Sequence, residues 1–245
     1  MDGELDCDKM DYLLRDSLYC GVTYGKYDLD RFVSTLTAYK HDNHLQLAIE
    51  RGGVQALEEF VLARYFMFIQ VYFHKTRRYL DKVLVNSLKA VLPNGKYPSD
   101  IGEYLKWDDI HALNLISESD SDEVKAFKRR EIMTCVLESK AHSENADKMN
   151  ARMIYKLLQK DYGDRVVFDS VDKAAHKLAP MLLSPKDDSG KGIMILDVKT
   201  GEVKDIMGES LILGSIVQPI SINRIYADKE IADEVLIKIK ELQSA

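Results

Sequence analysis

The spacing of apolar and polar residues predicts an amphipathic helix near the start of the chain. A helix over residues 8–18 turns by about 100° per residue. One arc then holds two carboxylates, an amine and a phenol, which belong to Asp8, Lys9, Tyr12 and Asp16. The opposite face holds apolar or small side chains, those of Met10, Leu13, Leu14 and Ser17. This second face is therefore expected to pack on a core.

Helical patterns continue through most of the first 150 residues. Helices are predicted over residues 29–36, 53–92, 100–116 and 121–142, with Asp28 capping the first of them. The stretch 53–92 contains no proline and is apolar on most sides, which is typical of a central helix that is bent or broken once. The segment 37–49 is strand-like at both ends, with turn residues at its centre, and predicts a hairpin.

The pattern changes near residue 150. Short runs rich in β-branched residues predict strands at 165–171, 192–198, 201–207 and 221–227. Residues 197–203 have the composition of a hairpin turn, residues 184–192 that of a loop, and 228–243 that of a helix capped by Asp228. We therefore expect a mainly α protein, with an all-α part at residues 1–150 and a smaller α+β part at residues 151–245.

Composition narrows the class of protein. The net charge of -6 gives no overall basic field for nucleic acid, so a nucleic-acid partner is not expected. No run approaches the roughly 18 apolar residues of a membrane span. The acidic start lacks the regions of a secretory signal. Cys7, Cys20 and Cys135 are odd in number and form no CxxC pair, which argues against a disulfide framework or a cysteine zinc site. A cytoplasmic location fits these features.

The polar arc of the opening helix carries the groups that a nucleotide site needs. A carboxylate at Asp8 can bind a divalent cation. Lys9 and Tyr12 can contact phosphate oxygens, and Asp16 can accept a hydrogen bond from a sugar hydroxyl. The alternative is a solvated surface helix with ion pairs between successive turns. Composition alone favours that alternative.

The order of residues 5–22, LDCDKMDYLLRDSLYCGV, favours the nucleotide site over the solvated surface helix. It closely resembles the pattern LDxD(K/R)xDYxxRDxxxxG(V/I) of HD-domain deoxynucleoside triphosphate triphosphohydrolases. The resemblance continues through YDLDRFV, through the predicted hairpin and through ARYFMFIQVYFHKTRR, to about residue 140. It implies that the all-α part is of the HD-domain type.

The resemblance implies a role for each matching residue. Asp8 would complete a metal site, Lys9 and Tyr12 would contact the triphosphate, and Asp16 would hold the sugar 3′-hydroxyl. On the long predicted helix, Arg64 would contact phosphate, and Tyr72 would pack on the deoxyribose and disfavour a 2′-hydroxyl. Supporting roles are expected for Asp6, His74 and Lys75.

Helical spacing supports part of this assignment. Arg64, Tyr72 and Lys75 fall within about 80° of one face of a continuous helix. Phe68 lies on the same face, where some family members have a histidine near the phosphates. This departure puts phosphate or proton-transfer chemistry at position 68 in doubt. Taken singly, Tyr72 could be a core aromatic and Lys75 a solvated charge.

The family's metal site, H…HD…D, combines two histidines and two aspartates around Mg²⁺, Mn²⁺ or a similar divalent ion. The H…HD segment precedes the opening motif in the family, and here only five residues precede Asp6. The pair His41-Asp42 follows Asp8 in a predicted turn, so we interpret it as unrelated to a metal site. Our hypothesis is that the chain is the C-terminal portion of such an enzyme and that it is inactive alone, because one aspartate does not hold a metal usefully.

Three functions stay open at this point. The first is a hydrolase portion that acts on deoxynucleoside triphosphates within a homo-oligomer or beside a chain carrying H…HD. The second is a non-catalytic nucleotide-binding or assembly subunit. The third is a helical scaffold with no nucleotide site. Whether the chain is itself an enzyme depends on which of these holds.

Overall fold

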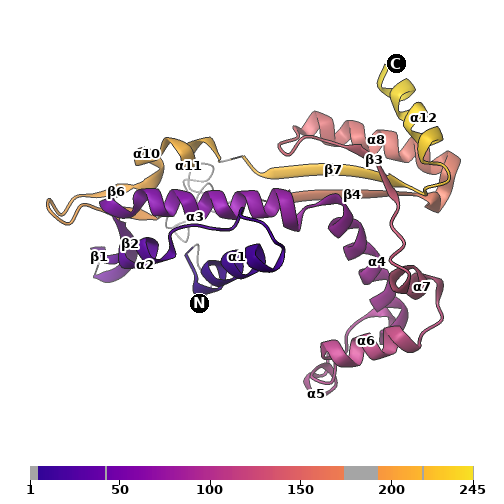
Figure 1. Ribbon diagram of the computed structural model, residues 1–245, viewed down its shortest axis with the longest axis horizontal. Helices are drawn as coiled ribbons and strands as arrows, with labels where there is room; N and C mark the ends of the chain where they lie inside the picture. The colour runs from indigo at the N-terminus through magenta and orange to yellow at the C-terminus, as the bar shows by residue number, and fades with distance from the viewer. Residues whose placement is uncertain (1–4, 42, 174–192, 217, 245) are drawn as a thin grey trace. The chain divides into compact units, whose positions relative to one another are not determined.

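The computed structural model describes residues 5–41, 43–173, 193–216 and 218–244 (Figure 1). The chain forms two compact units, each assembled from separate stretches of sequence. Unit 1 comprises Met1–Tyr72, Lys140–Ser143 and Val171–Ile222. Unit 2 comprises Phe73–Ser139, Glu144–Ser170 and Asn223–Ala245. The sequence predicted a single boundary near residue 150, whereas each unit combines segments from both sides of that residue.

Unit 1 combines helices with a small mixed sheet. Its elements are α1 (Cys7–Tyr19), α2 (Leu29–Ser34), β1 (Leu36–His41), β2 (His44–Glu50), η1 (Arg51–Gly53), α3 (Val54–Met67), η2 (Phe68–Tyr72), β5 (Met194–Leu196), β6 (Val203–Asp205), α10 (Ile206–Glu209) and α11 (Leu211–Ser215). The strands β4 (Val166–Lys173) and β7 (Ile220–Ala227) each contribute residues to both units.

The sheet of unit 1 has the strand order β1-β2-β5-β6. The predicted N-terminal hairpin is confirmed, since β1 and β2 pair antiparallel from Leu36–Ile49 to His41–His44. Asn43, in the turn, has a φ of 64°. The other predicted hairpin is also confirmed, because β5 and β6 are antiparallel. However, β2 pairs in parallel with β5, so a sheet runs through the part that was expected to be all-α.

The core of unit 1 holds α1 and α3 in place. Met10 and Leu13 are buried on α1, as its pattern predicted, although Leu14 is only partly buried. The rings of Phe32 and Phe60 stack at 5.1 Å between centroids. Asp28 caps α2 by accepting a hydrogen bond from the Arg31 backbone, as expected. In the polar arc of α1, Asp8 is exposed and Lys9, Tyr12 and Asp16 are partly buried, with Tyr12 packed against this core.

Gly25 fixes the loop that follows α1. A Cβ at this buried position would lie 2.3 Å from the Leu13 carbonyl oxygen and 2.9 Å from the Ser17 Cβ. Because a backbone atom cannot move aside cheaply, we expect Gly25→Ala to lower the free energy of unfolding by about 1–3 kcal/mol. Thermal melting followed by circular dichroism measures this loss. Gly208→Ala is the matched control, since nothing lies within 4 Å of a Cβ there; equal melting of the two variants would contradict the prediction.

Unit 2 is built on a three-stranded sheet with the order β3-β7-β4. Its other elements are α4 (Lys75–Val91), η3 (Pro93–Gly95), α5 (Ile101–Tyr104), α6 (Asp109–Glu118), α7 (Asp122–Lys128), β3 (Thr134–Glu138), α8 (Asn145–Tyr162), η4 (Gly163–Arg165) and α12 (Ala232–Ser244). Its core includes Val136 of β3, Ile154 and Leu158 of α8, and Val235 of α12.

Several predicted helices of unit 2 are corrected. The helix expected at 121–142 is wrong, because α7 ends at Lys128 and Thr134–Glu138 is β3, paired antiparallel with β7. The helix expected at 100–116 is divided into α5, which Asp100 caps, and α6. Asp228 does not cap the last helix, which begins at Ala232. The loop expected at 184–192 lies outside the described residues.

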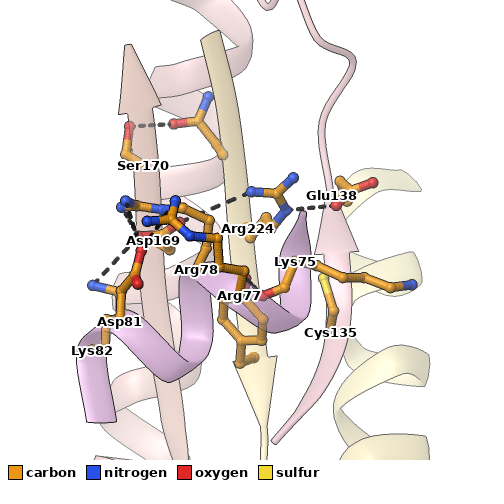
Figure 2. A network of polar contacts seen from close by, with 12 residues as sticks. Lys75, Arg77, Arg78, Asp81, Lys82, Cys135, Glu138, Asp169, Ser170 and Arg224 are labelled. Atoms are coloured by element: carbon orange, nitrogen blue, oxygen red, sulfur yellow. Dashed lines mark hydrogen bonds and ion pairs between the residues drawn. The ribbon is translucent and has the colours of Figure 1, made fainter. Parts of the chain in front are cut away.

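A buried ion network joins α4 to the sheet of unit 2 (Figure 2). Asp169 of β4, only 1% exposed, accepts two hydrogen bonds from the Arg78 guanidinium, at 2.8 and 3.1 Å. Lys82 approaches the same carboxylate at 3.6 Å and Arg224, 3% exposed, at 4.0 Å. Arg224 also donates to Glu138 at 2.5 Å. One buried carboxylate thus offsets charge from three cations.

Candidate functional site

The N-terminus of α1 positions Asp6 and Lys9. The Asp6 carboxylate caps the helix by accepting a hydrogen bond from the Lys9 backbone at 2.8 Å. A second contact of the same carboxylate is an ion pair with the Lys9 ammonium. A cap of this kind contributes on the order of 1 kcal/mol to helix stability. In this chain Asp6 therefore holds the first turn and orients Lys9.

Two residues that the sequence placed on separate helices meet in unit 1. The Tyr72 hydroxyl, on η2, donates a 2.9 Å hydrogen bond to Oδ2 of Asp16 on α1. Burial first, and then this hydrogen bond, raise the pKa of Tyr72 well above its ordinary value. The phenol therefore stays a neutral donor. The Asp16 side chain keeps 31% of its surface exposed, with Oδ1 lying 3.7 Å from Arg15.

Tyr12 completes this group on α1. Its ring meets that of Tyr72 edge to face, with centroids 6.1 Å apart. Burial raises the pKa of the Tyr12 hydroxyl, while the positive charges of Arg64 and Lys9 act in the opposite direction. Tyr12 is therefore within the electrostatic reach of both cations that the sequence assigned to phosphate binding.

Arg64 and Phe68 extend the site along α3 and η2. Arg64 is buried, and its guanidinium carbon lies 5.4 Å from the centre of the Phe68 ring. Phe68 in turn meets Tyr72 edge to face at 5.4 Å. The structure thus brings together five of the residues considered from the sequence, namely Tyr12, Asp16, Arg64, Phe68 and Tyr72. We call these five the aromatic–carboxylate cluster.

The long predicted helix is interrupted just after this cluster. Residues 68–72 form the π-helical turn η2, and α4 begins at Lys75. The expected break in the long helix is confirmed. The prediction that Lys75 shares one helix face with Arg64 and Tyr72 assumed a continuous helix, so it does not hold across this break. His74 and Lys75 are exposed and belong to unit 2. Their supporting roles stay a prediction.

Asp8 lies on the exposed face of α1. Among the described residues, no three His, Cys, Asp or Glu side chains are grouped so that they could hold a metal ion. His41 and His44 are exposed on the N-terminal hairpin, and Asp42 is not among the described residues. The described residues therefore do not by themselves fit the metal site that the sequence resemblance implies.

Lys173 is a residue near the cluster that sequence reasoning missed. It is the last residue of β4, and its ammonium lies 4.9 Å from the centre of the Phe68 ring. No motif marks it, because it follows an ordinary strand pattern far from the opening segment. Only the fold of unit 1 reveals the contact.

The chain belongs to the HD associated region family, whose model matches residues 27–177 and thus more than half of the sequence. The match begins after α1, so the opening motif lies outside it. Within the described residues, no helix combines the length and the apolar character that crossing a bilayer requires.

Two curated relatives are uncharacterized proteins. One, from Methanocaldococcus jannaschii, is 31% identical over 130 residues, covering 53% of this chain and 28% of the relative. The other, YwfO of Bacillus subtilis, is 36% identical over 85 residues, covering 35% of this chain and 19% of the relative. The alignments thus span less than a third of either relative.

Two solved structures are similar to this chain. A hypothetical protein from Aquifex aeolicus is 29% identical, with a TM-score of 0.77, covering 98% of this chain and 58% of that one. A phosphohydrolase from Bacteroides thetaiotaomicron is 22% identical, with a TM-score of 0.62, covering 93% of this chain and 62% of that one. The second likeness concerns the fold alone. The family description associates the chain with HD domains.

Proposed function

We propose that this chain forms the substrate-recognition part of a deoxynucleoside triphosphate triphosphohydrolase, which converts a dNTP into a deoxynucleoside and inorganic triphosphate. The observation that carries the proposal is the hydrogen bond between Tyr72 and Asp16. It places an aromatic ring beside a partly exposed carboxylate, the two groups needed to pack on a deoxyribose and to accept its 3′-hydroxyl.

The proposed roles follow from the chemistry of each side chain. Asp16 accepts a hydrogen bond from the 3′-hydroxyl, and Tyr72 packs against the sugar where a 2′-hydroxyl would project. Arg64 and Lys9 supply positive charge for the phosphates, and Tyr12 supplies a neutral donor. These groups bind and orient the substrate, which lowers the entropic part of the barrier to reaction.

Catalysis in this proposal needs a divalent metal such as Mg²⁺ or Mn²⁺, which polarises phosphate and lowers the pKa of a bound water. Asp8 would be one ligand, and the other ligands would come from outside the described residues. We propose that the active species is a homo-oligomer or a complex with a chain that carries H…HD.

A second candidate function is a non-catalytic nucleotide-binding or assembly subunit. It is favoured by the lack of a grouped set of three metal-ligating side chains within the described ranges. In this case the aromatic–carboxylate cluster would bind a nucleotide without hydrolysing it. Release of triphosphate from dGTP, measured with Mg²⁺ or Mn²⁺ together with the metal content of the same sample, separates the two functions.

Tyr72 should control the choice between deoxyribose and ribose. We expect the protein to bind dGTP at least about tenfold more tightly than GTP, and Tyr72→Ala to bring the ratio of the two dissociation constants close to one. The reason is that alanine opens the space beside C2′ that the ring fills. Isothermal titration calorimetry with both nucleotides measures the ratio.

Tyr19→Ala is the control for this experiment, because Tyr19 lies on the same helix as Asp16 and is 84% exposed. It should leave the ratio unchanged. Equal binding of dGTP and GTP by the unmodified protein would overturn the proposed sugar recognition, and so would a preference that survives in Tyr72→Ala.

A further inference from the structure

A partly open cleft lies among three helices of unit 2. The helices α4, α6 and α7 pack against one another (Figure 1), and the cleft between them has a volume of about 600 Å³. Four apolar side chains line it, those of Leu80, Leu113, Ile116 and Phe127. The polar lining residues are Ser117, Lys128 and Arg130. A volume of this size with a mainly apolar lining is typical of small-molecule sites.

Arg130 has an unusual backbone conformation for an arginine. Its φ is 51°, in the left-handed region, where the other described non-glycine residues are both asparagines. The helix α7 ends there with two backbone hydrogen bonds, from Arg130 to Phe127 and from Glu131 to Ala126. Glycine is the usual residue at this position of a helix end, because a Cβ destabilises the left-handed conformation. Residues held in such a conformation cluster at functional sites, including those that clamp ligands.

The two cations that line the cleft differ in what they already bind. The Lys128 ammonium donates hydrogen bonds to two backbone carbonyl oxygens at the end of α6, so its charge is held in place there. The Arg130 side chain is exposed, and no described residue pairs with its guanidinium. Glu131, the next residue, pairs instead with Arg129 at 3.4 Å. Among the described residues that line the cleft there is no carboxylate, so the donors of Arg130 are available to an anionic ligand.

We propose that this cleft binds a small amphipathic carboxylate, such as a medium-chain fatty acid, with its hydrocarbon part on the four apolar walls and its carboxylate on Arg130. A guanidinium matches a carboxylate with two parallel hydrogen bonds, and one available cation suits one negative charge. The apolar walls favour a hydrocarbon, whereas they would leave the hydroxyl groups of a sugar without partners. The site goes beyond the proposed function, because its lining belongs to unit 2 and the aromatic–carboxylate cluster to unit 1.

Octanoate, used below the concentration at which it aggregates, is the probe that tests this site by isothermal titration calorimetry. We expect the full chain to bind octanoate, and Arg130→Gln to weaken this binding by about tenfold, as for the loss of one charge-assisted hydrogen bond. Arg130→Gly should show the same loss without a lower melting temperature, because glycine adopts a positive φ freely. Lys125→Gln is the matched control, since it removes a positive charge from α7 outside the lining and should bind octanoate normally.

Two further measurements test the two parts of the site. Octanol, which has the hydrocarbon without the charge, should bind at least about tenfold more weakly than octanoate. Leu113→Asp, at a wall position that is 53% exposed, should also weaken octanoate binding, because it places a like charge in the cleft.

Several results would overturn the proposed carboxylate site. These are no octanoate binding by the unmodified protein, equal binding of octanoate and octanol, unchanged octanoate binding in Arg130→Gln or Leu113→Asp, and an equal loss in Lys125→Gln. A lower melting temperature for Arg130→Gly would also count against it, because the arginine would then serve the fold. Binding of dGTP tests the proposed function separately and should be the same in Arg130→Gln as in the unmodified protein.

Discussion

Replacing Asp169 with alanine is expected to lower the free energy of unfolding of unit 2 by about 3–5 kcal/mol. Asp169 is 1% exposed and accepts both hydrogen bonds from Arg78. Its loss would leave Arg78 without both of these hydrogen bonds, and it would leave Arg224, 3% exposed, with Glu138 as the carboxylate that still pairs with it. Removing one partner of a buried ion network costs more than the network contributes, because the desolvated cations that remain lose a partner that water does not fully replace.

Urea unfolding followed by tryptophan fluorescence measures this effect selectively, since the single tryptophan, Trp107, lies in unit 2. Asp169→Asn should lose less than Asp169→Ala, because the amide oxygen can still accept one hydrogen bond. Asp122→Ala is the control, since the Asp122 side chain is 97% exposed and its ion pair with Lys125 is a surface contact. A loss below about 1 kcal/mol for Asp169→Ala would show that the network is not needed.

Replacing Asp16 with alanine is expected to weaken dGTP binding by about 10- to 100-fold, which corresponds to one hydrogen bond to a charged acceptor. Binding of 2′,3′-dideoxyGTP should change little, because that nucleotide has no 3′-hydroxyl to donate. The comparison separates recognition from folding. Any rearrangement of Tyr72, which loses its acceptor in the variant, would affect both nucleotides alike.

Calorimetric titration of both nucleotides into both proteins completes the thermodynamic cycle. Asp11→Ala is the matched control, because Asp11 lies on the same helix, is 65% exposed and pairs with Arg15. That variant should bind dGTP normally. An equal loss of affinity for dGTP and for the dideoxy analogue in Asp16→Ala would show that Asp16 supports the site without contacting the 3′-hydroxyl.

The sequence correctly predicted those elements that are stabilised by residues close to one another in the chain. The amphipathic pattern of α1, the Asp28 cap of α2 and the two hairpins depend on residues close to one another in the chain, and the structure confirms them. The family pattern also selected Asp16 and Tyr72 before their contact was known. Spacing along one helix could not show that contact, because the two residues come from α1 and η2.

The features that were missed depend on contacts between distant segments. The charged segment before β3 has a helical pattern, which led to the prediction of one helix through residue 142. Thr134–Glu138 is instead a strand, because β7 supplies its pairing partner. The helix α8 was not predicted, although its buried residues repeat at helical spacing. Asp169 and Lys173 lie on an ordinary strand pattern, and their partners come from α4, β7 and η2.

The π-helical turn η2 has a consequence for how the site tolerates change in chain length. A π turn closes its hydrogen bonds over five residues, where an α-helix uses four, so one turn accommodates an additional residue. Tyr72 is the last residue of this turn. Outside that turn, between Arg64 and Met67, losing one residue would bring Phe73, and gaining one would bring Val71, to the place of Tyr72 beside Asp16, because each α-helical residue turns the chain by about 100°. The number of residues in this stretch therefore selects the side chain that faces the carboxylate, whereas exposed loops of the same chain can vary in length without that effect.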